Sequence, residues 1–128
     1  MAITTPSDDI IVQEGTFAYS FQASGAVSGG AVLKATGTMK VSHAGATTTQ
    51  GLVGVAAYEV PKNAYVAVYG PGNIVRCCAS GTFVVGSILY PVGTGKVDDY
   101  GTWGTNEAIG VALEASTTNL QAVRVLLK

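Results

Sequence analysis

The chain has 128 residues, with seven basic and eight acidic side chains and a formal net charge of −1 at pH 7. Such a chain has no basic surface that could displace counterions from nucleic acid or bind anionic lipid, so we expect neither as a direct partner. Charged residues make up 12% of the chain and hydrophobic residues 48%. This composition favours a subunit of a larger assembly, partly covered by its neighbours, over an isolated soluble β domain.

The N-terminal segment, residues 1–9, has no basic region followed by an apolar core. It is therefore not a secretory signal, and we expect the protein to stay in the compartment where it is made. No stretch of the chain approaches the roughly 18 apolar residues that a membrane-crossing helix needs.

Strand signals dominate the rest of the chain. Apolar residues alternate with small or polar ones over residues 17–22 and 65–69, with the period of two that a half-buried strand shows. Further strand candidates, in chain order, are residues 31–36, 52–60, 74–79, 87–92, 108–115 and 121–127. A short helix is an alternative for residues 106–115, but the glycines and β-branched residues of the matching segment 50–59 favour a strand for both.

The sequence repeats itself at an offset of 56 residues. Between residues 23–56 and 79–112, 14 of the 34 aligned positions are identical without a gap, where composition alone would give about three. The identities lie at Ala23, Ser24, Gly25, Gly30, Leu33, Gly37, Thr38, Lys40, Val41, Gly45, Thr49, Gly54, Val55 and Ala56. Two units are too few for a solenoid. The sequence thus predicts an all-β fold, a small Gly-rich barrel over residues 15–128, built from pseudo-repeats of about 15–70 and 71–128.

One strand pattern occurs three times in this two-unit chain. Ile10 and Val12 align with Val66 and Val68, which align in turn with residues 123 and 125 after a one-residue insertion. If the second and third copies close the sheet, the first is surplus. We therefore hypothesise that residues 1–14 form an arm whose Ile10, Ile11 and Val12 add as a strand to a neighbouring protein. An ordinary first strand of the barrel is the alternative.

The residues that could carry chemistry are few. His43 is the one histidine of the chain, and we expect it in a solvated turn at residues 42–45. The neighbouring Asp98 and Asp99 would point to opposite faces of a strand, and we interpret them as part of a turn. With no histidine cluster, no paired carboxylates and no nucleophile with a base, we expect no metal site, no cofactor and no enzyme.

The segment Gly93–Lys96 has the composition of a phosphate-binding loop, but the preceding glycine of that motif is absent, Val97 follows the lysine and no helix is expected after it. Its counterpart Gly37–Lys40 keeps the lysine without the second glycine. Both segments are therefore interpreted as hairpins.

Two adjacent cysteines, Cys77 and Cys78, are sterically unsuited to a conventional structural disulfide with each other. Because Cys77 aligns with Phe21 and Cys78 with Gln22, we expect one thiol in the core and the other facing outward. A second local feature is the Gly-rich segment that contains Tyr100 and Trp103. These aromatic residues are interpreted either as an exposed contact surface or as a cap on one end of the barrel.

The run from Gly81 to Tyr90, the Gly-Val-Ala segment at residues 110–112 and the alternating C-terminal strand at residues 123–127 resemble the small capsid decoration (cement) proteins of tailed bacteriophages. The resemblance covers the chain from about Val12 onward. It implies a compact all-β fold of the tulip-like or barrel kind. It also implies a homotrimer that binds the major capsid protein on the outer surface of the expanded head, made in the host cytoplasm and carried on the virion. It also implies a capsid contact through the N-terminal arm.

The function expected from the sequence is thus stabilisation of a viral capsid by a non-enzymatic decoration protein. The alternative is a carbohydrate-binding or adhesive β module, in which Tyr58, Tyr100 and Trp103 would stack on sugar rings. A small hydrolase is not supported, because the sequence lacks the required geometry of acid, base and nucleophile.

Overall fold

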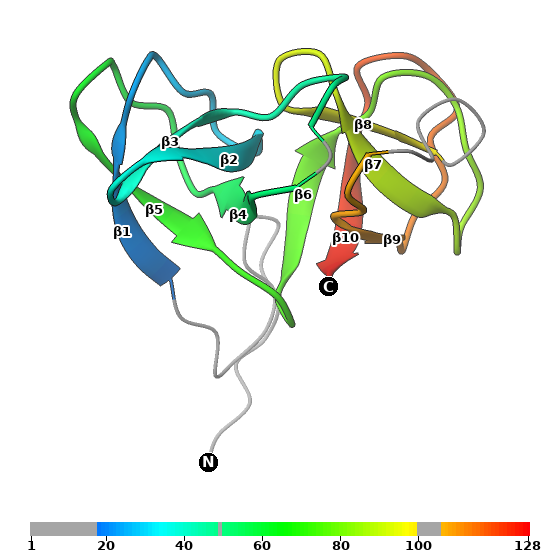
Figure 1. Ribbon diagram of the computed structural model, residues 1–128. Helices are drawn as coiled ribbons and strands as arrows, with labels where there is room; N and C mark the ends of the chain where they lie inside the picture. The colour runs from blue at the N-terminus through cyan, green and yellow to red at the C-terminus, as the bar shows by residue number, and fades with distance from the viewer. Residues whose placement is uncertain (1–17, 49, 100–105) are drawn as a thin grey trace.

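The structure, a computed structural model, describes residues 18–48, 50–99 and 106–128, and this part of the chain is all-β. Its strands are β1 (Ala18–Ala23), β2 (Val32–Gly37), β3 (Lys40–His43), β4 (Leu52–Ala56), β5 (Tyr65–Tyr69), β6 (Ile74–Cys78), β7 (Ile88–Val92), β8 (Lys96–Asp99), β9 (Gly110–Ala112) and β10 (Ala122–Leu127). They form a first lobe, β1–β5, and a second lobe, β6–β10, which lie side by side (Figure 1).

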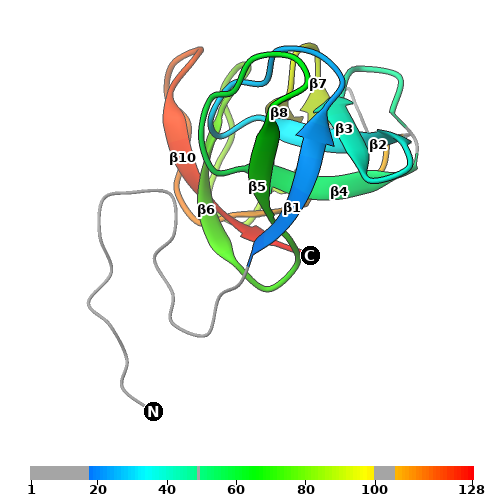
Figure 2. The same cartoon turned by 90° about the vertical axis from the view of Figure 1, so that its left-hand side faces the viewer.

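The two lobes have the same connectivity. In the first lobe the strand order is β1-β3-β2-β4-β5, and the sheet closes into a barrel because β1 also pairs with β5. Figure 2 faces this lobe and shows β1 between β3 and β5. The second lobe has the order β6-β10-β9-β7-β8, in which every neighbouring pair corresponds to a pair of the first lobe. The predicted all-β fold of two pseudo-repeats is confirmed.

Irregular contacts repeat as well as the strands. The antiparallel bridge between Val27 and Val60 recurs between Phe83 and Ser116. The parallel pairing of β1 with β3 recurs in the second lobe as the bridge from Ala79 to β8. Repetition of these non-ladder contacts shows that the halves share loop conformations and not only strand positions.

Most strands coincide with the predicted segments, although β4 ends at Ala56 and β9 covers only Gly110–Ala112. The alternative helix over residues 106–115 is wrong. The segments Gly37–Lys40 and Gly93–Lys96 connect antiparallel strands, as the hairpin interpretation predicted. The strands β3 and β8 were not predicted, and they correct two expectations. His43 lies at the end of β3 instead of in a turn, and Asp98 and Asp99 lie in β8.

The second and third copies of the repeated strand pattern become β5 and β10. Val66 and Val68 are buried in the first lobe, and Val123 and Val125 are buried in the second. Each strand has two neighbours in its own lobe, since β5 pairs with β1 and β4, while β10 pairs with β6 and β9. The first copy of the pattern lies outside the described residues.

Apolar side chains gather in two clusters that do not divide at the lobe boundary. One cluster fills the first barrel and includes Leu33, Val41 and Val66. The other fills the second lobe but also includes Val32 and Val55 from the side of the first lobe that meets the second. Burial of this shared surface joins the lobes, because separating them would expose apolar area to water.

Hydrogen bonds across the junction add to this packing. The Val32 amide donates to the Gly95 carbonyl at 2.9 Å, and the Gly95 amide donates to the Ala44 carbonyl at 2.8 Å. The β7–β8 turn of the second lobe thus lies against β2 of the first lobe. Elsewhere at the junction, the Leu52 amide donates to Oε1 of Glu107 at 2.9 Å.

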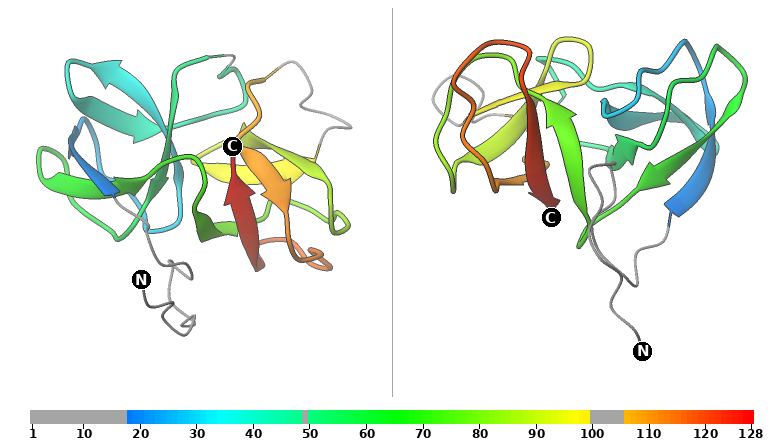
Figure 3. Two further views of the ribbon diagram at one scale, coloured as in Figure 1. Left: turned by 90° about the horizontal axis from the view of Figure 1, so that it is seen from below. Right: turned by 180° about the vertical axis from the view of Figure 1, so that it is seen from behind.

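The views from below and from behind also show the lobes side by side, with the C-terminal end of β10 on the side of the second lobe that faces the first (Figure 3). Across residues 18–48, 50–99 and 106–128, no helix has the length and apolar character that a membrane span requires.

Candidate functional site

The predicted contact residues lie in segments that the structure does not describe. The arm residues Ile10, Ile11 and Val12 precede residue 18, and Tyr100 and Trp103 lie between residues 99 and 106. Tyr58 is described and is half exposed. Its two predicted sugar-stacking partners, Tyr100 and Trp103, are outside the described residues. The roles assigned to these residues therefore stay predictions.

His43 has a structural environment that defines its protonation state. Its Nε2 atom accepts a hydrogen bond from the Ser28 amide at 3.0 Å, which requires this nitrogen to be unprotonated. Burial lowers the pKa of His43 below its ordinary value, because desolvation disfavours the imidazolium. The neutral ring thus serves as an acceptor that ties the 26–30 loop to β3.

Acidic and sulfur side chains form no ligand cluster in the described part of the chain. No three of its His, Cys, Asp or Glu residues are grouped so that they could hold a metal ion. Asp98 accepts a hydrogen bond from the Asp99 amide at 2.8 Å and also lies beside Gly81. These contacts give Asp98 a local structural role in the second lobe.

The two thiols occupy different environments, as the repeat predicted. Cys77 is buried and Cys78 is partly exposed. Burial, with a smaller effect of the neighbouring Cys78, raises the pKa of the Cys77 thiol to about 12. Since the thiolate is the reactive form, Cys77 should be inert near neutral pH.

We therefore expect a thiol reagent at pH 8 to modify one cysteine in the folded protein and two after denaturation. At this pH a thiol with a pKa near 12 has only about one part in ten thousand as thiolate. The folded Cys78→Ser variant should show no modification on the same timescale. Two rapidly modified thiols in the folded wild type would contradict the burial of Cys77.

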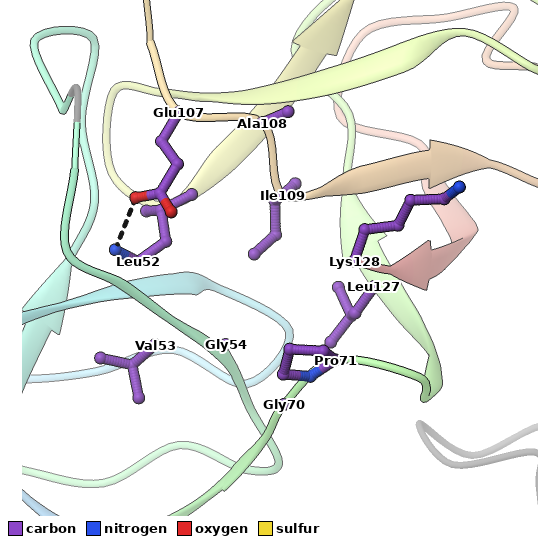
Figure 4. Close-up of a pocket in the computed structure, with 10 residues that line it drawn as sticks. All are labelled: Leu52, Val53, Gly54, Gly70, Pro71, Glu107, Ala108, Ile109, Leu127 and Lys128. Atoms are coloured by element: carbon purple, nitrogen blue, oxygen red, sulfur yellow. Dashed lines mark hydrogen bonds between the residues drawn. The ribbon is translucent and has the colours of Figure 1, made fainter.

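A small pocket at the lobe junction is lined by residues of both halves (Figure 4). Glu107 points across it to the Leu52 amide, and Ile109 and Leu127 supply apolar walls. The pocket holds about 30 Å³, enough for a water molecule, whereas small-molecule sites are usually about ten times larger or more. It is a packing gap at the junction and not a substrate site.

The strongest candidate for a functional surface is an exposed apolar face on the second lobe. Val84 and Val85 are 70% and 61% exposed in the turn before β7, and Ile88 at the start of β7 is 46% exposed. Leu113, just after β9, adds a fourth apolar side chain. We call these four residues the outer face. Contiguous exposed apolar residues of this kind mark interaction surfaces.

Sequence reasoning did not single out the outer face, although a signal was present. The repeat aligns Val84 and Val85 with Ser28 and Gly29, so two small residues of the first lobe become β-branched apolar ones in the second. Identities between the halves reveal the fold, whereas these differences point to the surface that distinguishes one lobe from the other.

The fold is a duplicated five-stranded β unit, whose first copy closes into a barrel and whose second copy carries the exposed apolar outer face. Its structure is similar to the crystal structure of the head fibre gp8.5 N base of bacteriophage phi29, with a TM-score of 0.65 and 22% sequence identity. The likeness covers 88% of this chain and 94% of the phage chain. No protein-family model matches the sequence, and no curated protein matches it.

The resemblance drawn from the sequence pointed to proteins attached to the heads of tailed phages. The solved structure reported above, which has a similar fold, is the base of a head fibre of a bacteriophage. At this level of identity, the likeness shows that the two chains share a fold.

Proposed function

We propose that this chain is a structural protein of a phage head, specifically a non-enzymatic decoration protein that binds the outer surface of the expanded capsid and stabilises it. The observation that carries the proposal is the shared fold with the base of a phage head fibre, over nearly the whole of both chains. The low charge and the exposed apolar outer face support it, because both suit a protein that works in contact with others.

Stabilisation by such a protein would be a mass-action effect. A protein that binds the expanded shell and not the unexpanded one stabilises the expanded shell by RT ln(1 + [L]/Kd) at every binding site. A homotrimer would bind through several contacts at once, so that modest single affinities give firm attachment. The chemistry required of the chain is therefore complementarity to the major capsid protein, with no catalytic group.

The N-terminal arm is the proposed contact with the capsid. Both β5 and β10 have places in their own lobes, and β1 of the first barrel is already flanked by β3 and β5. In the proposal, Ile10, Ile11 and Val12 extend a sheet of the capsid protein, whose edge would satisfy their backbone hydrogen bonds.

The test is cosedimentation with heads assembled from the major capsid protein of the same genome. The full chain should saturate expanded heads at a fixed stoichiometry, raise their thermal stability and leave unexpanded heads unbound. Removing residues 2–12 should change the melting temperature of the free protein by no more than about 2 °C, because an arm that packs on the capsid would contribute little to the core of its own chain. The same deletion should abolish head binding.

Two results would reject parts of this proposal. Absence of binding to expanded heads would reject the decoration function. A large drop in melting temperature on deletion would show that residues 2–12 belong to the core of the protein, which would reject the arm.

A further inference from the structure

The contact between the two lobes leaves an equivalent surface uncovered on the second lobe. In the first lobe, Val32 and Val55 pair across β2 and β4 and point out of the barrel, where the second lobe buries both completely. The corresponding pair in the second lobe is Ile88 and Val111, which pair across β7 and β9 in the same register. Ile88 is 46% exposed, whereas Val32 is fully buried, so the described chain leaves about half of Ile88 uncovered.

The residues around this uncovered pair are more apolar than those around its covered counterpart. Val84 and Val85 replace the Ser28 and Gly29 of the first lobe. An exposed surface without a partner would be expected to become more polar than a buried one, because exposed apolar area carries an association hazard. The opposite change indicates that the outer face of the second lobe is itself covered in the working protein.

The first lobe presents the matching half of this contact. Gly95, at the tip of the β7–β8 turn, is the residue of the second lobe that bonds to Val32. Its equivalent in the first lobe is Met39, at the tip of the β2–β3 turn. Both residues have a left-handed backbone, with φ of 55° at Met39 and 77° at Gly95. Met39 is 59% exposed, so this turn is available to a partner.

The two surfaces lie at opposite ends of the molecule. The β2–β3 turn is on the side of the first lobe away from the second, and the start of β7 is on the side of the second lobe away from the first (Figure 1). The view from below shows the same arrangement (Figure 3). One chain therefore cannot bring its own two surfaces together, but a second copy can supply the missing one.

Larger side chains would make the contact between copies wider than the contact within a chain. A Cβ atom at Gly95 would come within 2.7 Å of the Ala31 Cβ, so Met39 cannot approach as closely as Gly95 does. The internal junction contains a gap of about 300 Å³ that is lined by Gly29, Ala122 and neighbours. In the contact between copies, Val85 takes the place of Gly29 and Tyr65 takes the place of Ala122. Both replacements are larger and exposed, so they would fill the corresponding gap when the two surfaces lie further apart.

From this repetition we infer that copies of this chain associate head to tail, with the Met39 turn and Tyr65 of one copy packed on Val85 and Ile88 of the next. The contact reproduces between chains the junction that already joins the two lobes within a chain. It is heterologous, so successive copies close into a ring or extend as a filament. A ring of three, as in the proposed homotrimer, requires an interface of this type, but the inference does not depend on capsid binding.

The test uses two complementary variants of the full chain and measures mass by light scattering or sedimentation. Ile88→Asp removes the outer face of the second lobe, and Met39→Asp removes the turn surface of the first lobe. The wild type should form an oligomer, and each variant alone should be a monomer of 13.0 kDa. A mixture of the two variants retains one intact pair of surfaces, so it should form 1:1 dimers and no larger species.

A matched control is Leu120→Asp. Leu120 is 58% exposed and has a φ of 65°, so its exposure and backbone resemble those of Met39, but it borders the internal junction. This variant should assemble as the wild type does. If circular dichroism shows that Ile88→Asp is unfolded, Val85→Asp tests the same surface from a turn in which both neighbours are exposed.

Three outcomes would overturn the inference. They are a monomeric wild type at the highest soluble concentration, oligomers of normal size from both single variants, and a variant mixture that remains monomeric. If the wild type were monomeric and Ile88→Asp lost head binding, the outer face would be assigned to the capsid contact. Loss of head binding with normal self-association would reject only the decoration function.

Discussion

Replacing Gly110 by alanine is expected to lower the free energy of unfolding by about 3 kcal/mol or more, since an added Cβ atom would overlap the backbone carbonyl oxygen of Leu126. The methyl group of Val125 lies 3.0 Å from the same position. A clash with a flexible side chain can relax by rotation, but this carbonyl belongs to β10, which is held in its ladder by β6 and β9. Relief would require the sheet itself to move.

The repeat supplies a replicate and a control for this prediction. Gly54 occupies the equivalent place in the first lobe, where a Cβ atom would overlap the carbonyl oxygen of Tyr69, so Gly54→Ala should be similarly damaging. A Cβ atom at Gly25 would meet nothing within 4 Å beyond its own chain neighbours, and Gly25→Ala should change stability by less than about 1 kcal/mol. Urea denaturation followed by circular dichroism measures all three. Equal urea midpoints for the Gly110 and Gly25 variants would contradict the close approach of β10 to β9 at Gly110.

The second large effect is expected at Val32, which is fully buried, whereas its equivalent Ile88 is 46% exposed. Val32→Asp places a carboxylate among apolar side chains of the shared core, beneath the second lobe. A buried charge without a compensating partner costs several kcal/mol, so we expect this variant to be largely unfolded at 25 °C. The equivalent variant, Ile88→Asp, places its carboxylate in water and should keep the fold.

Thermal melts of dilute samples compare the two variants without a contribution from self-association. We expect a folded transition for Ile88→Asp close to that of monomeric wild type, and no cooperative transition for Val32→Asp. The Val32→Ala variant distinguishes the effect of the buried charge from the effect of lost side-chain volume. It should lower the free energy of unfolding by about 1 to 3 kcal/mol. Similar melting temperatures for the two aspartate variants would show that the lobes do not pack as described.

The local strand pattern was predicted wherever a segment carried enough apolar residues to show a period of two. β5, β6 and β10 alternate along most of their length and were located correctly. The strands β3 and β8 escaped prediction because each has four residues with one buried apolar side chain, Val41 or Val97. Their pairing through tight turns, and not their composition, makes them strands.

Polar side chains in those two short strands led to the wrong assignments. Asp98 is a typical turn residue and His43 lies in the segment Ser42–Gly45, whose ends are typical turn residues, so sequence reasoning placed both in turns. In the structure, hairpin pairing extends each strand through them, and His43 gains a hydrogen bond from Ser28, which lies fifteen residues away in sequence. Contacts of this range cannot be read from a local window.

The sequence by itself determined that the chain is one β unit used twice, since identities at glycines and core valines specify backbone geometry and inward-facing positions. Only the tertiary structure decided that the two units are unequal. Alternation shows which side of a strand Val32 and Ile88 occupy, but whether that side meets water depends on what packs against it. The second lobe buries Val32 completely, while the described chain leaves Ile88 46% exposed, and this difference in burial separates a core residue from a surface available to another protein.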